Sequence, residues 1–301
     1  MKAVTIERNG EQKLAALSND ELIIDLQAAQ TKRGGTYRVP ETMVEAASAG
    51  PSFWTEIKEI ADWALEHKGQ DVVFSVESQG ITVKAPIPRP LKNIICAGKN
   101  YAEHAVEMGS AADVPEHPII FTKSPTTVIG PDEMISPHLN VTNELDYEGE
   151  IAVIVGKQGT GIKADEAENY IFGYTLLNDV TARDLQTQHK QFFLGKSLDT
   201  FCPMGPGVVS AQALKGEDIS LKTYVNGELR QESTTSKMIF SVASLIEIIS
   251  RGMTLEPGDI IATGTPAGVG KGFKPPRYLK SGDEILIQAE GVGELRNHVL
   301  K

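Results

Sequence analysis

The sequence predicts an α+β protein that is mainly β. A rolled β-core with few helices is expected, preceded in the sequence by a smaller α+β domain. Two observations support this class. After Lys92 the chain has many short apolar segments bounded by Gly, Pro, Asn and Asp, which is typical of a curved sheet system. Helical periodicity is concentrated earlier in the chain, so we expect two domains, residues 1–85 and 86–301.

The N-terminal domain is expected to combine short strands with two helices. We predict a strand over 22–26, a helix over 40–47 that ends before Gly50-Pro51, an amphipathic helix from Ser52 to about His67, and a hairpin that joins 72–76 to 81–83 around Gln79-Gly80. Three prolines in the stretch 85–90 exclude a regular helix or a central strand there. This stretch is therefore predicted to be an extended linker.

The larger domain is expected to consist of short strands around one helix. The helix covers 240–250, where Val242, Leu245, Ile246 and Ile249 share one face. The predicted strands are 94–97, 119–121, 151–155, 174–177, 221–225, 260–262 and 284–287.

Charge and composition exclude several classes of function. The net charge is −11 and no run of Lys and Arg occurs, which argues against a nucleic-acid partner. The apolar runs are shorter than a membrane span and the N-terminus lacks a secretory apolar region, so we expect a cytoplasmic protein without membrane insertion. Cys96 and Cys202 lie among apolar residues and are expected to be reduced, buried thiols.

Two carboxylates stand two residues apart at the start of an apolar strand. Side chains alternate along a strand, so Glu148 and Glu150 point the same way. Like charges on one face of a near-buried strand repel each other and lose hydration, unless a cation lies between them. With Asp179, which follows the apolar stretch 171–178, they form a set that suits Mg²⁺ or Mn²⁺. The alternative is a solvated face at a strand edge.

Two other segments carry candidate catalytic groups. His104 and Glu107 are three residues apart in a short helix, so they are either a general base with its orienting carboxylate or an ordinary exposed pair. Lys123 and Lys196 are lone cations beside apolar residues. Each is either a solvated surface lysine or a group that balances the carboxylates and binds an anionic substrate.

A glycine-rich stretch covers residues 263–272. It is not a Walker A loop, because Gly272 stands where Ser or Thr should follow the lysine and Pro275-Pro276 exclude a following helix. We expect its backbone amides and the Thr265 hydroxyl to face an oxyanion.

Taken in order, these segments resemble the fumarylacetoacetate hydrolase family of metal-dependent C–C bond-cleaving enzymes. The resemblance runs from Asn93 to about Ile287 and depends on six motifs, which together are specific although each alone is weak. They are Gly98-Lys99-Asn100-Tyr101 with His104, Phe121-x-Lys123-x-Pro125, Leu145-Asp146-Tyr147-Glu148-x-Glu150, Asn178-Asp179-Val180-Thr181-Ala182-Arg183-Asp184-x-Gln186, Lys196-Ser197-x-Asp199-Thr200, and Gly258-Asp259-Ile260-Ile261-x-Thr263-Gly264-Thr265-Pro266-x-Gly268-Val269-Gly270.

The resemblance implies a mixed β-roll catalytic domain behind a small N-terminal domain, usually in a homodimer. It also implies Mg²⁺ or Mn²⁺ bound to the three carboxylates and a mobile lid that carries His104 and Glu107. The residues that it implies are as follows: metal ligands Glu148, Glu150 and Asp179; catalytic residues His104, Glu107 and Lys196; and substrate-binding residues Lys123, Arg183, Gln186 and Thr265.

This residue set is consistent with chemistry on a small 2-oxo acid. Breaking the C3–C4 bond of a chelated 2-oxo acid leaves a pyruvate enolate, whose charge the cation and Lys196 would stabilise. A ketone at C4 makes the reaction hydrolysis of an acylpyruvate, with water activated by His104 and Glu107, whereas a carboxylate at C4 makes it a lyase-type decarboxylation of an oxaloacetate-like acid. Enol–keto isomerisation uses the same enolate. A non-catalytic metabolite sensor or scaffold on this fold is the alternative from another class.

Overall fold

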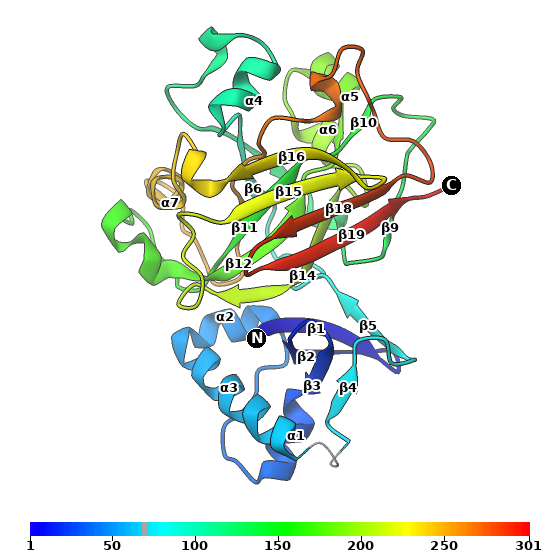
Figure 1. Cartoon of the computed structure of the whole chain (residues 1–301). Helices are drawn as coiled ribbons and strands as arrows, with labels where there is room; N and C mark the ends of the chain where they lie inside the picture. Colours follow the sequence, from blue (N-terminus) through cyan, green and yellow to red (C-terminus); the bar gives the residue numbers. More distant parts are fainter. Residues whose placement is uncertain (68–70) are drawn as a thin grey trace.

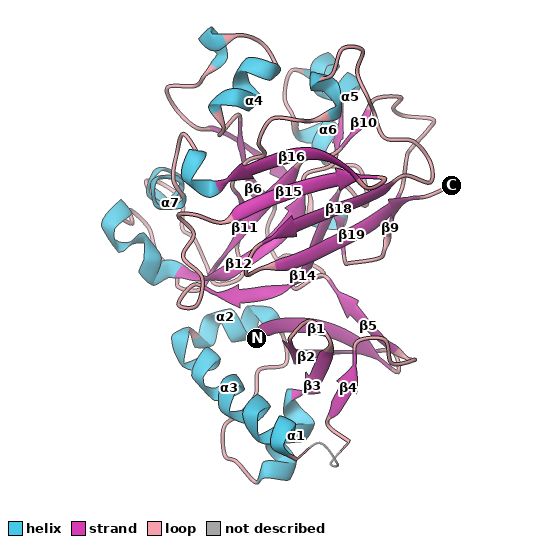
Figure 2. Ribbon diagram, in the orientation of Figure 1, coloured by secondary structure: helices cyan, strands magenta, loops and turns pink. Residues whose placement is uncertain are grey.

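Two sheets make up most of the structure, a computed structural model that describes residues 1–67 and 71–301 (Figure 1). The larger sheet has the strand order β4-β3-β2-β1-β14-β12-β11-β17-β6-β7, with β5 beside β1 and β8 beside β14. The second sheet has the order β16-β15-β18-β19-β9, and β10 pairs with β13. Strands dominate and the helices are few and short outside the N-terminal unit (Figure 2), so the predicted fold class is confirmed.

The elements of the N-terminal unit are β1 Lys2–Arg8, β2 Glu11–Ser18, β3 Leu22–Asp25, α1 Leu26–Arg33, α2 Met43–Ala49, α3 Pro51–Glu66, β4 Val73–Ser75 and β5 Ile81–Lys84. The remainder of the chain begins with β6 Ile94–Gly98, α4 Ala102–Glu107, β7 Ile119–Lys123, β8 Val128–Ile129, β9 Met134–Ile135, β10 Leu145–Asp146, β11 Gly149–Val155, β12 Ile171–Asn178 and β13 Thr181–Ala182. It continues with α5 Arg183–His189, α6 Phe193–Lys196, β14 Cys202–Ser210, β15 Ser220–Val225, β16 Glu228–Thr234, α7 Val242–Ser250, β17 Ile260–Ala262, β18 Glu284–Ala289 and β19 Gly293–Val299.

Strand β11 lies in the middle of the molecule and is buried on both faces. Its Ala152 and Ile154 belong to a core shared with the N-terminal helices, whereas Ile151 and Val153 belong to the core shared with the second sheet. Burial on both faces explains why the sequence of β11 is a continuous apolar run rather than an alternating one.

The N-terminal unit is joined to the rest of the chain by both backbone and side chains. Strand β1 pairs with β14, with Ala3 opposite Val208, so one sheet continues through both units. In α3 the indole of Trp54 packs on Phe172 of β12, with ring centroids 4.9 Å apart, and its Nε1 donates a hydrogen bond to the Phe172 carbonyl. The division at residue 85 remains a prediction.

The hairpin predicted over 72–83 is wrong. Strand β4 pairs with β3, and β5 pairs with β1, so the two strands lie on opposite sides of a curled sheet with β3, β2 and β1 between them. The curled sheet encloses a small core that includes Ile6 and Ile23, and Ile81 packs against this core. The packing of the half-buried Ile81 against this core favours the pairing of β5 with β1 over a hairpin with β4.

Candidate active site

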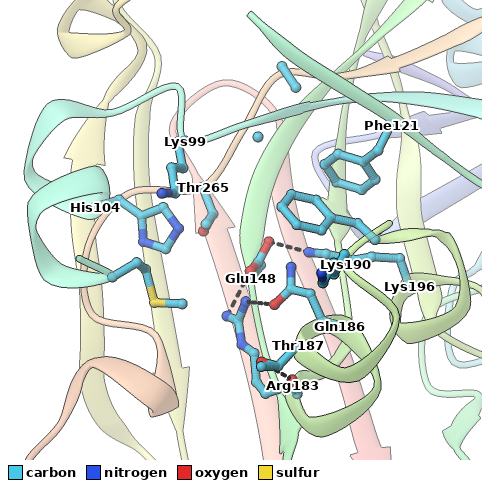
Figure 3. A pocket seen from close by; sticks show the side chains of 14 residues that line it. Lys99, His104, Phe121, Glu148, Arg183, Gln186, Thr187, Lys190, Lys196 and Thr265 are labelled. Carbon is cyan, nitrogen blue, oxygen red and sulfur yellow. Dashed lines mark hydrogen bonds and ion pairs between the residues drawn. The ribbon is translucent and has the colours of Figure 1, made fainter. Parts of the chain in front are cut away.

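The site lies at the end of the molecule that is opposite the N-terminal unit, where α4, α5 and α6 surround the start of β11 (Figure 1). A pocket of about 290 Å³ is found there. Figure 3 shows the side chain of Glu148 in the middle of this pocket, with His104 on one side and Lys196 on the other.

Strand pairing brings the three predicted metal ligands together. Strands β11 and β12 are antiparallel with Gly149 opposite Asn178, so the start of one strand lies beside the end of the other. The amide of Asp179 donates a 2.8 Å hydrogen bond to the carbonyl of Glu148, which fixes the two segments relative to each other. As a result Glu148, Glu150 and Asp179, all buried, each offer an oxygen, and these oxygens lie within 4.8 Å of one another.

Three buried cations surround these carboxylates. Lys196 Nζ lies 2.7 Å from both Glu148 Oε2 and Asp179 Oδ2. Lys123 Nζ lies 2.6 Å from Asp179 Oδ1 on the other side. Arg183 Nη2 is 2.7 Å from Glu148 Oε1, an ion pair that is not aligned as a hydrogen bond, while its Nε donates to Asp146.

The cations are not shared equally among the acids. Burial by itself would raise the pKa of Glu148, but Lys196 and Arg183 outweigh burial and lower this pKa to about 2. Glu150 accepts a hydrogen bond from the Gly264 amide, and burial together with Asp179 and Glu148 raises its pKa well above the usual value. The raised pKa of Glu150 shows that its ionised form is poorly compensated, because the nearby cations pair with Glu148 and Asp179 instead.

The donor set therefore fits a hard divalent cation. Four buried acids (Asp146, Glu148, Glu150 and Asp179) face three buried cations (Lys123, Arg183 and Lys196), which leaves one formal negative charge. Clustered carboxylate oxygens are ligands that Mg²⁺ and Mn²⁺ accept, and a cation would relieve the repulsion that raises the pKa of Glu150.

The predicted catalytic pair lies in α4, which is folded over the pocket. His104 is buried, and its Nδ1 lies 3.3 Å from Glu107 Oε2. Because a carboxylate only accepts hydrogen bonds, this contact places the proton on Nδ1 and leaves Nε2 as the basic nitrogen. Glu107 also accepts hydrogen bonds from the amide of Gly268, at 2.9 and 3.2 Å. The mobility implied for this segment remains a prediction.

The glycine-rich stretch 263–272 directs its amides toward carboxylates of the protein itself. Besides the contacts of Gly264 and Gly268, the amides of Gly270 and Lys271 donate to the two oxygens of Asp146. The hydroxyl of Thr265 donates to the Gly149 carbonyl and accepts from Gln231. The oxyanions that these amides bind are therefore carboxylates of the protein, those of Glu150, Glu107 and Asp146.

Three of the four predicted substrate-binding residues line the pocket, and the fourth, Lys123, does not. Arg183, Gln186 and Thr265 line the pocket, and the Gln186 side-chain oxygen accepts a hydrogen bond from Arg183. Lys123 does not line the pocket: it is fully buried beneath Asp179, and its ammonium also donates to the carbonyls of Val180 and Lys196. Lys123 therefore holds Asp179 in place from beneath. The geometry does not favour a direct contact between Lys123 and a substrate.

The pocket also has lining residues that sequence reasoning did not select. They are mainly the cations Lys99 and Lys190 and the apolar side chains of Met108, Phe121 and Phe192. Lys99 stands in the first family motif, which is a signal that was available. Lys190 lies in a polar segment without any motif, so only the fold brings it to the site.

The two cysteines are free, buried thiols, as predicted. Burial raises the pKa of Cys96 well above its usual value, and burial likewise raises the pKa of Cys202 to about 12. Both thiols are therefore protonated and unreactive at neutral pH. Within the described ranges, none of the helices is long and apolar enough to cross a membrane.

The chain is similar to known proteins along almost its whole length. The family model described as fumarylacetoacetate (FAA) hydrolase C-terminal matches residues 93–300. The chain is 50% identical to oxaloacetate tautomerase YisK of Bacillus subtilis over 300 residues, which covers 99% of this chain and 100% of that protein.

Solved structures show the same fold over the whole chain. A fumarylacetoacetate hydrolase from Exiguobacterium antarcticum superposes with a TM-score of 0.82 at 39% identity, covering 100% of this chain and 99% of that one. A 2-hydroxyhepta-2,4-diene-1,7-dioate isomerase from Mycobacterium marinum superposes with a TM-score of 0.73 at 30% identity, covering 100% and 98%.

Proposed function

Because the chain belongs to the fumarylacetoacetate hydrolase family, we propose that it is an enzyme acting on a small 2-oxo acid, with enol–keto tautomerisation of an oxaloacetate-class acid as its main reaction. The observation that carries the proposal is the buried carboxylate and ammonium centre facing an imidazole across a small pocket. The relative that is 50% identical is named an oxaloacetate tautomerase, which supports this substrate class.

The chemistry of tautomerisation matches the groups that line the pocket. Conversion of the keto form to the enol removes a proton from C3 and adds one, from solvent water, to the oxygen at C2. Nε2 of His104 is the base that takes the C3 proton, with Glu107 holding the imidazole tautomer. The ammonium of Lys196 faces the same space and stabilises the charge that develops on the C2 oxygen.

The proposed cofactor is Mg²⁺ or Mn²⁺, held by Glu148, Glu150 and Asp179. When bound, it supplies Lewis acidity at the 2-oxo group. The protein's own share is to hold these carboxylates close together and to offset part of their charge. Lys196 contacts both Glu148 and Asp179, and Lys123 contacts Asp179 from beneath. The Gly264 amide donates to Glu150, whose raised pKa leaves it as the ligand that a bound cation would stabilise most.

Two cations that line the pocket favour a second carboxylate on the substrate. In Figure 3, Lys99 lies on the same side of the pocket as His104, and Lys190 lies beside Gln186 on the other side. Lys99 is 3.3 Å from Asp113, an ion pair with both side chains partly exposed. In the described part of the chain, the ammonium of Lys190 has no hydrogen bond or ion pair, so it is available to an anionic group.

Cleavage of the C3–C4 bond is the second candidate reaction. It is supported by the same His104–Glu107 pair, because an imidazole held by a carboxylate is also a general base for the activation of water. Acylpyruvate hydrolysis needs that water, whereas oxaloacetate decarboxylation does not.

One set of assays tests the proposal. The purified chain is mixed with enol-oxaloacetate, and the loss of enol absorbance is followed with Mg²⁺, with Mn²⁺ and with EDTA. Pyruvate formation from oxaloacetate and from an acylpyruvate is measured in parallel. We expect metal-dependent acceleration of tautomerisation that exceeds both cleavage rates. Cleavage faster than tautomerisation would make the second candidate the main reaction, and no metal-dependent rate on any of these acids would refute the proposal.

We also propose a homodimer, as the family resemblance implies. Exposed apolar side chains such as Leu139, which is 66% exposed, and Val141 are available for such an interface. Light scattering after size-exclusion chromatography tests this, and a mass of 32.5 kDa, that of one chain, would contradict it.

A further inference from the structure

We propose that Tyr147 is a positioning residue that holds α4 over the pocket through the loop Gly268–Gly272, an inference that rests on the proposed function because it assigns the residue a role in that reaction. Tyr147 stands between Asp146 and Glu148 at the entrance to β11. Its side chain is buried in the core shared with the second sheet. It is not among the residues that line the pocket.

The phenol of Tyr147 and the carboxylate of Asp146 hold one side of this loop. Tyr147 donates a 2.7 Å hydrogen bond from its hydroxyl to the carbonyl of Gly268. Asp146 accepts hydrogen bonds from the amides of Gly270, at 2.7 Å, and Lys271, at 3.0 Å. Two consecutive residues therefore fix the loop at three backbone groups.

The other side of the loop holds Glu107. The Gly268 amide donates to both oxygens of the Glu107 carboxylate. A Cβ atom at Gly272 would lie 2.2 Å from the same carboxylate, so Glu107 fits against bare backbone there. Glu107 therefore links this loop to Nδ1 of His104.

Gly268 is held by several groups, and the Tyr147 hydroxyl is one of them. Gly268 has φ +106°, and a Cβ on it would meet the Arg230 carbonyl at 1.9 Å, so the residue is confined between β16 and α4. Its amide and its carbonyl both have partners, since the amide donates to Glu107 and the carbonyl accepts from Tyr147. Loss of the Tyr147 hydroxyl frees the carbonyl side, and the position of the amide that orients Glu107 is then less well defined.

The variant Tyr147→Phe tests this role, because it removes one hydroxyl and keeps the ring. Tyr174→Phe is the matched control, since Tyr174 is also a buried tyrosine but lies away from the catalytic pocket. The first readout is amide hydrogen exchange of the full chain with Mn²⁺ present. The amides of Ala105, in α4, and of Met108, directly after it, are hydrogen-bonded in the structure. Both should exchange about fivefold faster in Tyr147→Phe, the equivalent of one net hydrogen bond, and be unchanged in the control.

The second readout is a double-mutant cycle with Glu107→Gln. Tyr147→Phe should lower kcat about fivefold with little change in KM, and should have less than about a twofold further effect when Glu107 is already Gln. Unchanged α4 exchange in Tyr147→Phe, or losses of kcat that simply multiply, would overturn the proposal. Since hydrogen exchange needs no substrate, a failure of the proposed reaction would not be confused with a failure of this inference.

Discussion

Replacing Lys123 with Met tests how much a buried cation contributes to the stability of the folded carboxylate cluster when no metal is added. Lys123 is fully buried, its Nζ lies 2.6 Å from Asp179 Oδ1, and it also donates to the Val180 carbonyl. Methionine preserves the length of the side chain but removes the charge. Asp179, itself fully buried, would then have one ammonium partner, Lys196, in place of two.

The expected loss follows from breaking a buried ion pair on one side. Such a change costs about 3–5 kcal/mol of unfolding free energy, because it leaves a buried charge without compensation. Since Lys196 still contacts Asp179, we expect a value near the lower end, about 3 kcal/mol, in EDTA. Mn²⁺ should recover part of this loss, because it stabilises the folded state by binding to the same carboxylates.

The measurement is urea unfolding followed by far-UV circular dichroism. Tryptophan fluorescence is unsuitable, since both tryptophans, Trp54 and Trp63, lie in α3 of the N-terminal unit. Lys58→Met is the matched control: its ion pair with Asp62 is also 2.6 Å long, but the two side chains are 69% and 56% exposed, so we expect no measurable change. Equal, small losses in the two variants would refute the reasoning that burial gives the Lys123 pair its importance.

Four further predictions concern the site. Glu150→Gln should abolish detectable Mn²⁺ binding by calorimetry while the circular dichroism spectrum is retained, and unchanged binding would remove Glu150 from the ligand set. Lys196→Met should lower kcat/KM by about 10²-fold or more, the cost of losing one preorganised contact to developing charge, with no rescue by Arg; a change below about twofold would contradict this. His104→Ala should reduce acylpyruvate hydrolysis about 10²-fold or more beyond its effect on decarboxylation, and equal losses would show that His104 does not activate water. Lys190→Met should raise KM for oxaloacetate more than KM for a 2-oxo acid with one carboxylate, and parallel changes would contradict a role in binding the second carboxylate.

The parts of the fold that could be predicted from the sequence are those fixed by local pattern. The apolar runs of β11 and β12 and the helical spacing in α3 and α7 are properties of neighbouring residues, and all four elements are present. The hairpin of β1 and β2 was missed although Asn9-Gly10, with φ values of 54° and 79°, is a typical two-residue turn between strands. Attention to that dipeptide would have found it.

What could not be predicted depends on contacts between distant segments. The pairing of β4 and β5 depends on which apolar side chains the curled sheet encloses, and no turn signal contains that information. Lys123 and Lys196 are indistinguishable as lone cations in apolar surroundings, yet one lies under Asp179 and the other lines the pocket. Their difference is tertiary: Lys123 ends β7, an edge strand of the larger sheet that pairs with β6, whereas Lys196 ends the short helix α6.

The entrance to β11 connects the structural and the chemical roles of this region. Glu148 contacts Lys196, and Glu150 on the same face accepts a hydrogen bond from the Gly264 amide. Gly149 between them points to the other side, where a Cβ would meet the Thr223 hydroxyl at 2.2 Å. A register slip of one residue would turn the carboxylates toward this closely packed face and leave Lys196 with Asp179 as its one remaining partner among these acids. Pairing with β12 on one side and β17 on the other prevents the slip. The same backbone constraint therefore fixes the two carboxylates and, through the preceding Asp146 and Tyr147, the loop that holds Glu107.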